Sequence, residues 1–216
     1  MVVSIYSLAN KDKVYVQMLT EDKKTIIAQR EDDENYRDDE IVLNTVENWL
    51  KLTYQWDAYV PGLDKKDRGF ELQSSCHIKN PQFKGKARVP TPTYLASRLL
   101  APNIRQTFLC QLFNNTIPDS VYSEINPLKS DVFVFKPMKF KRLTEDLYQV
   151  ILVSTVTERI GNKEVNEFYV NLIVTLQAIK PDLLVFGEEE PSLLRKQVNA
   201  FLSNGMLIVS LQEYKG

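Results

Sequence analysis

Two long runs of β-branched and aromatic residues, both within the segment from Val132 to Ile179, constrain the fold of this chain more than any other feature. The runs are Tyr148 to Thr157 and Glu167 to Gln177, and Gly161-Asn162 lies between them. Residues of these types favour extended backbone, and a Gly-Asn pair favours a tight turn. The segment therefore predicts a meander of long antiparallel strands.

Two shorter strands are expected directly before the long runs, at Val132 to Phe135 and at Met138 to Leu143. In the middle of the predicted sheet, apolar residues occur on both faces of the strands. Strands of this kind are covered on both sides in folded proteins. We therefore expect both faces of the sheet to be covered, either by the helices of the chain or by a partner.

A stripe of residues with helical period precedes the strands. It consists of Val42, Val46, Trp49, Thr53 and Trp56. Asp38 or Asp39 is placed to cap the helix, because a carboxylate accepts the free amide hydrogens of a first turn. Pro61-Gly62 is placed to end it. Burial of large side chains contributes roughly 1.5–3 kcal/mol each, so we expect this helix to place the tryptophans in the core.

Two further helices are predicted on either side of Pro102. The first begins at Thr91-Pro92-Thr93, where a threonine cap and an early proline suit a helix start. Pro102 ends it, because proline lacks an amide donor and clashes with the preceding turn. The second runs from Asn103 to Phe113. Helices followed by paired strands, without βαβ alternation, indicate an α+β fold with helices packed on one face of a curved antiparallel sheet.

The beginning of the chain is set apart from this α+β domain. Val14 to Leu19 and Thr25 to Ala28 predict a hairpin, and an acidic stretch follows it. We assign residues 1–37 to an N-terminal hairpin and acidic linker, and residues 38–216 to a single α+β domain. No apolar run approaches the roughly 20 residues of a membrane span, so the chain as written is expected to be soluble.

The balance of charge argues against one broad class of partner. The chain has 27 Lys and Arg against 28 Asp and Glu, which gives a net charge of −1. Such a chain has no overall attraction for nucleic acid or for an anionic membrane. The acidic stretch from Glu21 to Glu40 and the basic stretch from Lys79 to Arg88 are interpreted as solvated surface.

Few residues of the chain are of the types that carry chemistry. His77 is the only histidine, and Cys76 and Cys110 are the only cysteines. These residues cannot supply a four-ligand zinc site without carboxylates, and no nucleotide-binding glycine motif is present. The two cysteines form one disulfide or remain as buried thiols. We therefore expect no catalytic residue, no metal and no cofactor, and we predict that the protein is not an enzyme.

Aromatic and basic residues alternate at the beginning of the sheet. Phe133 and Phe135 are followed by a basic patch of Lys136, Lys139, Lys141 and Arg142. A strand that exposes such residues can stack single-stranded nucleic acid. The alternative, which we favour, is that both phenylalanines point into the core and that the basic residues guard a sheet edge against strand addition.

Three segments of the chain resemble one protein family. Val14 to Lys24 is similar to the strand and turn that follow the membrane segment in that family, and Asn44 to Tyr59 is similar to its next helix. Asp146 to Val150, together with Glu158 to Gly161, resembles its hairpin motif. The family is that of TrbF and VirB-eight, the inner-membrane bridge subunits of conjugation and type IV secretion machines, and the resemblance is to their periplasmic domain.

The resemblance implies a nuclear-transport-factor-two-like fold, in which helices pack into the concave face of a strongly bent, cone-like sheet. It implies a non-catalytic scaffold or assembly subunit that associates with itself or with other secretion subunits. It also implies a location in the periplasm, or on the extracytoplasmic face of the inner membrane, with attachment through a segment absent from this chain. Without the resemblance, the cytoplasm is the expected location.

Two further expectations depend on the resemblance. The family's "NPxG" motif, which lies near its dimer contact, falls at Asn199 to Leu202, where Asn199 matches. The resemblance therefore implies an interface at Asn199, Phe201 and Leu202. The alternative function is a small-molecule-binding protein, or a lyase or isomerase, on the same cone-shaped fold. In that case Asp146 or Glu158 would act as a base in the concave pocket after desolvation.

Overall fold

The computed structural model describes residues 13–19, 25–31, 37–60, 64–72, 76, 86–180 and 202–215. The chain forms two units, Met1–Tyr36 and Arg37–Gly216. In the first unit, β1 (Lys13–Leu19) pairs with β2 (Thr25–Glu31) as an antiparallel hairpin. The hairpin predicted from the sequence is therefore confirmed.

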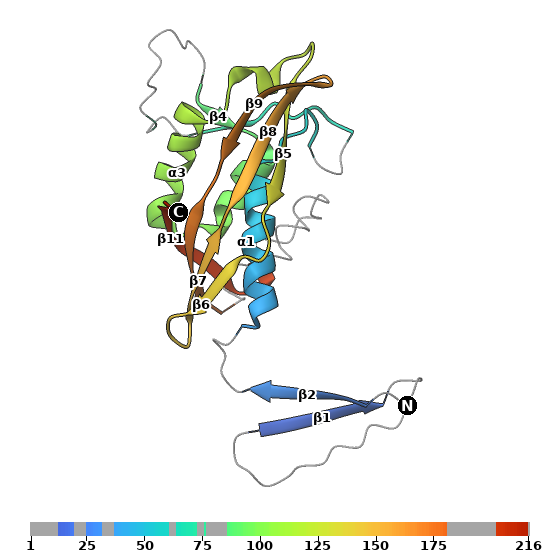
Figure 1. Ribbon diagram of the computed structural model, residues 1–216, viewed down its shortest axis with the longest axis vertical. Coiled ribbons are helices and arrows are strands. Elements are labelled where there is room, and N and C mark those ends of the chain that lie inside the picture. Colours follow the sequence, from blue (N-terminus) through green and yellow to red (C-terminus); the bar gives the residue numbers. More distant parts are fainter. Residues whose placement is uncertain are drawn as a thin grey trace. The chain divides into compact units, whose positions relative to one another are not determined.

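The second unit combines helices with antiparallel sheets (Figure 1). Its helical elements are α1 (Asp39–Tyr54), α2 (Thr91–Ala96), the 3₁₀ turn η1 (Ser97–Leu99), α3 (Pro102–Asn115) and the 3₁₀ turn η2 (Asp119–Tyr122). One sheet has the order β5-β8-β9 and another the order β11-β10-β7-β6, while β3 (Phe70–Glu71) pairs with β4 (Arg88–Val89). The α+β prediction is confirmed.

The strands of the two larger sheets are short. They are β5 (Leu128–Val134), β6 (Lys139–Arg142), β7 (Leu147–Leu152), β8 (Ser154–Ile160), β9 (Lys163–Tyr169), β10 (Leu172–Ala178) and β11 (Met206–Glu213). The predicted turn joins β8 to β9, and Gly161 has a φ of +61° that glycine adopts without strain. Near the end of the chain, β11 pairs with β10 as an antiparallel neighbour.

Each of the two long predicted strands bends and passes from one sheet into the other. The bends lie at Val153, between β7 and β8, and at Val170-Asn171, between β9 and β10. Ser154 holds them together, because its Oγ donates to the Val170 carbonyl at 2.6 Å and its own carbonyl accepts from the Val170 amide at 3.0 Å. Each predicted long strand is thus divided in two at this corner, where a buried serine completes the backbone bonding.

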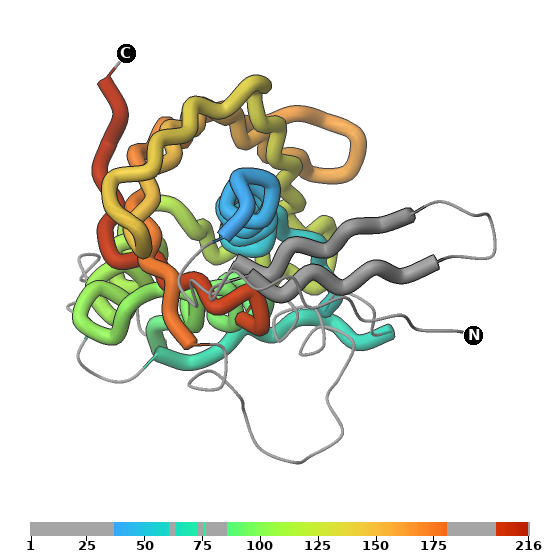
Figure 2. Tube along the Cα trace, turned by 90° about the horizontal axis from the view of Figure 1, so that it is seen from below, coloured from blue at the N-terminus to red at the C-terminus, as the bar shows by residue number. Residues whose placement is uncertain are grey.

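Helix α1 fills the concave side of the bent strands, which form an arc around it in Figure 2. The predicted stripe is confirmed as the core face of α1 and of the residues that follow it. Val42, Val46, Trp49 and Thr53 are fully buried, and Trp56 is almost so. The ring of Phe108 on α3 lies 5.7 Å from that of Trp49, which joins the two helices in the same core.

The ends of α1 differ from the sequence prediction. Asp38 occupies the N-cap position, but its carboxylate makes no capping hydrogen bond. The helix ends at Tyr54, well before Pro61, because the side chain of Ser130 on β5 forms hydrogen bonds with the backbone at this point. The Ser130 Oγ donates to the Tyr54 carbonyl at 2.6 Å and accepts from the Trp56 amide at 2.9 Å. Pro61 and Gly62 lie outside the described residues.

The predicted break at Pro102 is confirmed, and Pro102 is the first residue of α3. The predicted threonine cap of α2 was wrong, because Pro90 occupies the cap position and Thr91 is already helical. The carboxylate of Asp67 caps the helix instead. It accepts from the Thr91 amide at 2.8 Å and from the Thr91 hydroxyl at 2.6 Å. A distant aspartate thus satisfies an amide that the helix leaves free.

The sequence did not decide whether the two cysteines form a disulfide or remain as thiols. In the structure, Cys76 and Cys110 form a disulfide. The link ties Cys76 to α3 across 34 positions of sequence. Within the described residues, no helix combines the length and apolar content that a bilayer crossing requires.

We predict that Ser130→Ala lowers the free energy of unfolding by roughly 1–3 kcal/mol, because it leaves a buried amide and a buried carbonyl without their partner. Denaturant unfolding followed by tryptophan fluorescence would measure the change. The control is Ser123→Ala, which removes an exposed hydroxyl bonded to the Ile125 carbonyl. Equal effects of the two substitutions would contradict the role assigned to Ser130.

We also predict that the double variant Cys76→Ser/Cys110→Ser loses roughly 3–4 kcal/mol of stability, because the disulfide closes a long loop of the unfolded chain. Denaturant unfolding with and without reductant provides the measurement. Reductant should lower the stability of the parent chain to that of the double variant and leave the variant unchanged. A parent chain that is indifferent to reductant would rule the disulfide out.

Candidate functional site

The concave side of the sheet, where a cone-shaped enzyme would hold its substrate, is filled with core side chains. Trp49, Trp56 and Tyr148 are buried there with less than 2% of their surface exposed. The Trp56 indole Nε1 donates to the Thr53 carbonyl at 2.9 Å, so its polar edge is satisfied inside the core. The aromatic rings occupy the space that the small-molecule alternative requires.

A polar hollow of about 830 Å³ lies elsewhere, around the end of α1 and the turn between β8 and β9. Its charged groups are paired with one another. Lys129 Nζ lies 2.6 Å from Asp57 Oδ1, and Arg159 Nη1 lies 2.7 Å from Asp131 Oδ2. A hollow lined in this way lacks the apolar walls typical of small-molecule sites.

The two carboxylates considered as bases lie in different surroundings. Asp146 is half-buried, and its carboxylate accepts from Thr144 Oγ1 at 2.7 Å and from Gln177 Nε2 at 3.0 Å. The hydrogen bond from Thr144, and then that from Gln177, hold the pKa of Asp146 below its usual value. The predicted desolvated base was therefore wrong for Asp146, because a desolvated base has a raised pKa. Glu158 is buried and accepts from Asn166 Nδ2 at 2.9 Å.

The described residues contain no group of three or more His, Cys, Asp or Glu side chains placed to hold a metal ion. Cys76 and Cys110 are held in the disulfide, and His77 lies outside the described residues.

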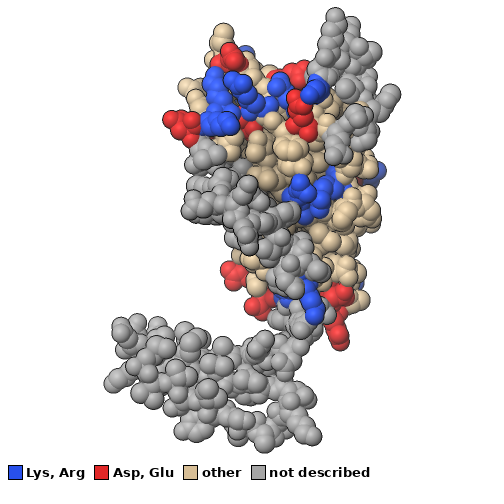
Figure 3. Space-filling view, turned by 180° about the vertical axis from the view of Figure 1, so that it is seen from behind, with Lys and Arg blue, Asp and Glu red and all other residues tan. Residues whose placement is uncertain are grey.

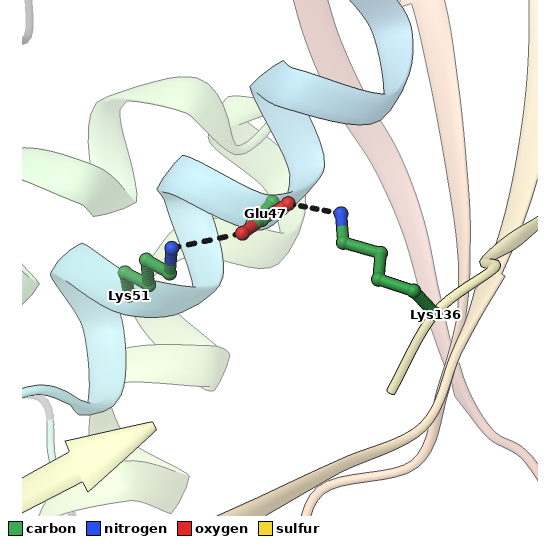
Figure 4. Close-up of polar contacts among 3 residues, drawn as sticks. All are labelled: Glu47, Lys51 and Lys136. Carbon is green, nitrogen blue, oxygen red and sulfur yellow. Dashed lines mark hydrogen bonds and ion pairs between the residues drawn. The ribbon is translucent and has the colours of Figure 1, made fainter. Parts of the chain in front are cut away.

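The structure does not bring the four residues of the predicted basic patch together. Lys136 turns toward α1, where it pairs with Glu47, while Glu47 also accepts from Lys51 at 2.8 Å (Figure 4). Arg142 lies over the Tyr148 ring, 5.4 Å from its centroid. Lys139 and Lys141 are exposed on β6, which is an edge strand. Their position agrees with the expectation that basic residues guard an edge.

The expectation that Phe133 and Phe135 point into the core was wrong. Phe133 is 62% exposed and Phe135 is 45% exposed, and their rings meet edge to face at 5.1 Å. The reason is the register of β5, in which Ser130 and Val134 are buried. Because side chains alternate along a strand, the odd-numbered residues that follow Ser130 face outward.

The two phenylalanines belong to a larger apolar surface on the outer face of the bent sheet. Phe133 lies opposite Thr155, which lies opposite Tyr169, and Tyr169 is 66% exposed. The next rows add half-buried aliphatic residues, since Ile151 lies opposite Ile173. We name this surface the outer apolar strip, and its residues are Phe133, Phe135, Ile151, Val153, Tyr169 and Ile173.

The helices that the structure describes leave the outer apolar strip uncovered, because α1 lies on the inner side of the arc (Figure 2). The sequence predicted apolar residues on both faces of these strands, and a cover on both. On one face that cover is α1 and the core around it. Tyr169, the most exposed aromatic of the strip, was not singled out from the sequence, because its alternation becomes visible only when the bend at Asn171 is known.

The residues expected at an interface near the end of the chain have a different outcome. Leu202 is 2% exposed and belongs to the hydrophobic core, which leaves it no surface to offer a partner. Asn199 and Phe201 lie outside the described residues.

The solved structures that resemble this chain have little sequence identity with it. No family model matches it, and no curated protein matches it. Among solved structures, it is similar to an IcmL-like type IV secretion system protein from Legionella pneumophila, with 12% identity and a TM-score of 0.48 over 82% of this chain and 91% of that chain. It is also similar to the VirB8 protein of Agrobacterium tumefaciens, with 14% identity and a TM-score of 0.40 over 80% and 89% of the two chains.

The ion pairs of Glu47 generate a prediction about acid stability. Lys136, and then Lys51, lower the pKa of Glu47, so the folded state favours the ionised form. The resulting stability is present above the unfolded pKa and is lost as the pH falls through the folded pKa. We predict that Glu47→Gln lowers stability at pH 7 by less than about 1 kcal/mol, as is typical of ion pairs at the protein surface, and flattens the loss of stability below about pH 4.5.

Urea unfolding of the parent chain and of Glu47→Gln, measured across the acid range, would check this prediction. Glu145→Gln is the control, because Glu145 is exposed. An unchanged acid profile in Glu47→Gln would show that the pairs with Lys136 and Lys51 contribute nothing in solution.

Proposed function

We propose that this protein is a non-catalytic assembly subunit that binds other proteins through the outer apolar strip, as a bridge component of a type IV secretion or conjugation machine would. The observation that carries the proposal is the exposure of Phe133, Phe135 and Tyr169 on a face that no described helix covers. Apolar residues that cluster on an exposed face are typical of protein interaction sites. Aromatic residues in particular are enriched at the centres of interfaces.

The filled concave side supports the same function. A scaffold needs a rigid body and an outer contact surface, whereas an enzyme on a cone-shaped fold needs an open pocket. In this chain Trp49, Trp56 and Phe108 fill the inner side. The resemblance of the sequence to the TrbF and VirB-eight family supports an assembly role independently of the strip.

The disulfide supports a location outside the cytoplasm. Disulfides persist in the periplasm and other oxidising compartments and are rare in the cytosol. The Cys76–Cys110 link therefore agrees with the periplasmic location that the resemblance implies. We propose that the domain works on the extracytoplasmic side of the inner membrane.

Nucleic acid is the less favoured occupant of the strip. Exposed phenylalanines near Lys139 and Lys141 meet one requirement for stacking bases. However, Asp131 and Glu167 border the same aromatic residues, and the chain carries a net charge of −1. On the opposite side of the second unit, acidic groups lie beside basic groups at the upper end of the view in Figure 3. A phosphate backbone requires a positive field, so a protein is the better partner.

We predict that Phe133→Ser/Tyr169→Ser weakens binding to a partner at least about tenfold, since buried aromatic residues carry much of the energy of an interface. The partners to test are purified products of the neighbouring genes, with binding measured by biolayer interferometry. Ile125→Ser is the matched control, because Ile125 is 81% exposed and lies outside the strip.

Two outcomes would contradict the proposed function. One is partner binding that the strip variant leaves unchanged, and the other is the absence of binding to every neighbouring product. A parallel titration with single-stranded DNA tests the nucleic-acid alternative, which requires binding that weakens steeply with salt.

A further inference from the structure

The outer apolar strip has charges of opposite sign at its two ends. One end is bordered by the row in which Asp131, Thr157 and Glu167 lie opposite one another on β5, β8 and β9. At the other end, Lys139 lies opposite Ile151, and Lys141 lies opposite Gln149. The apolar residues of the strip lie between a pair of carboxylates and a pair of lysines. The surface therefore has an acidic end, Asp131 and Glu167, and a basic end, Lys139 and Lys141.

These end groups are available to a partner. Lys139, Lys141 and Glu167 are exposed, and none of the three has an ion-pair partner within the described part of the chain. Asp131 pairs with Arg159, but the side chains of both remain about half exposed. Asp131 and Glu167 are far apart in the sequence, and the register of β5, β8 and β9 places them in one row of the same face.

From this arrangement we infer that the outer apolar strip binds the same strip of a second copy of the chain, face to face and with the strands antiparallel. The inference rests on the proposed function and names one partner for the same surface. A two-fold axis that crosses the strands at the centre of the strip turns the acidic end of one copy onto the basic end of the other. By symmetry the same contact forms twice.

Charge decides between this arrangement and its alternative. If the two copies were stacked with their strands parallel, each acidic end would lie on the other acidic end, and each basic end on the other basic end. Like charges placed together at an interface are disfavoured, whereas complementary ends fix the orientation of the partners. The apolar rows remain in contact in either arrangement, so the charged ends select the antiparallel one.

The size of the strip sets the strength of the association. Three neighbouring strands are about 14 Å wide, and the nine residues from Gln149 to Thr157 extend about 26 Å. The strip therefore covers roughly 400 Å² per copy, which is about half the area of a standard interface. The bend of the sheet reduces the contact further, because two convex faces touch mainly at their centres. The expected dimer is weak and depends on concentration.

The test is the self-association of the full chain, with its disulfide intact, by sedimentation equilibrium from about 10 μM to about 500 μM, a range that covers weak dissociation constants. The parent chain should dimerise within this range. Two variants reverse one end each, Lys139→Glu/Lys141→Glu for the basic end and Asp131→Lys/Glu167→Lys for the acidic end. Each variant alone should dimerise at least about tenfold more weakly, because both of its contacts then join like charges.

The decisive sample is an equal mixture of the two variants. In a mixed dimer every contact again joins opposite charges, so the mixture should dimerise about as strongly as the parent chain. The control is Lys65→Glu/Lys66→Glu, which reverses two exposed lysines outside the strip and should dimerise like the parent. Circular dichroism and urea unfolding verify that every variant is folded.

Three results would overturn the inference: a strictly monomeric parent chain at about 500 μM, a mixture that dimerises no better than its separate variants, or a control that is as weak as the strip variants. None of these results bears on the proposed function, because both charge-reversed variants keep the apolar residues of the strip. If a neighbouring gene product still binds the strip while the chain remains monomeric, the assembly role holds and the second copy is not its partner.

Discussion

The position of Ser130 determines which residues of the sheet face the core and which face outward. Its hydroxyl joins the end of α1 to β5 through the Tyr54 carbonyl and the Trp56 amide. Because a strand alternates with a period of two, fixing one residue inward fixes every other residue of that strand. Val134 is therefore buried, while Phe133 and Phe135 face outward. A single buried hydroxyl thus sets both the end of the main helix and the content of the outer apolar strip.

Ser154 has a comparable role at the corner of the sheet. Its hydroxyl and its carbonyl both bond to Val170, so the two bent strands turn together and remain paired. Because of this corner, the inner face of the strands surrounds α1, and their outer face points away from it. The bend, rather than any loop, therefore separates a filled interior from an exposed apolar face.

The elements that depend on neighbouring residues could be predicted from the sequence. The features that depend on contacts between distant residues could not. The stripe that includes Val42 and Trp49, the break at Pro102 and the Gly161-Asn162 turn depend on neighbouring residues, and all three were found. The early end of α1 depends on Ser130, more than 70 positions away. The cap of α2 depends on Asp67 in the same way. The outward position of Phe133 could not be predicted, because Val132 and Phe133 are equally apolar and only tertiary contacts choose between them.

The candidate site also depends on which face of the sheet the helices cover. The sequence indicated that the strands are apolar on both faces, which requires a cover on each, but it offered only one set of helices. Once α1 and its neighbours occupy the inner face, the apolar residues of the outer face have no cover among the described helices. The exposure of aromatic residues to water is unfavourable in free energy. Binding of a partner removes this surface from water, and exposed apolar patches are therefore typical of interaction sites. The proposed interaction therefore lies on the convex face, where the sheet meets solvent.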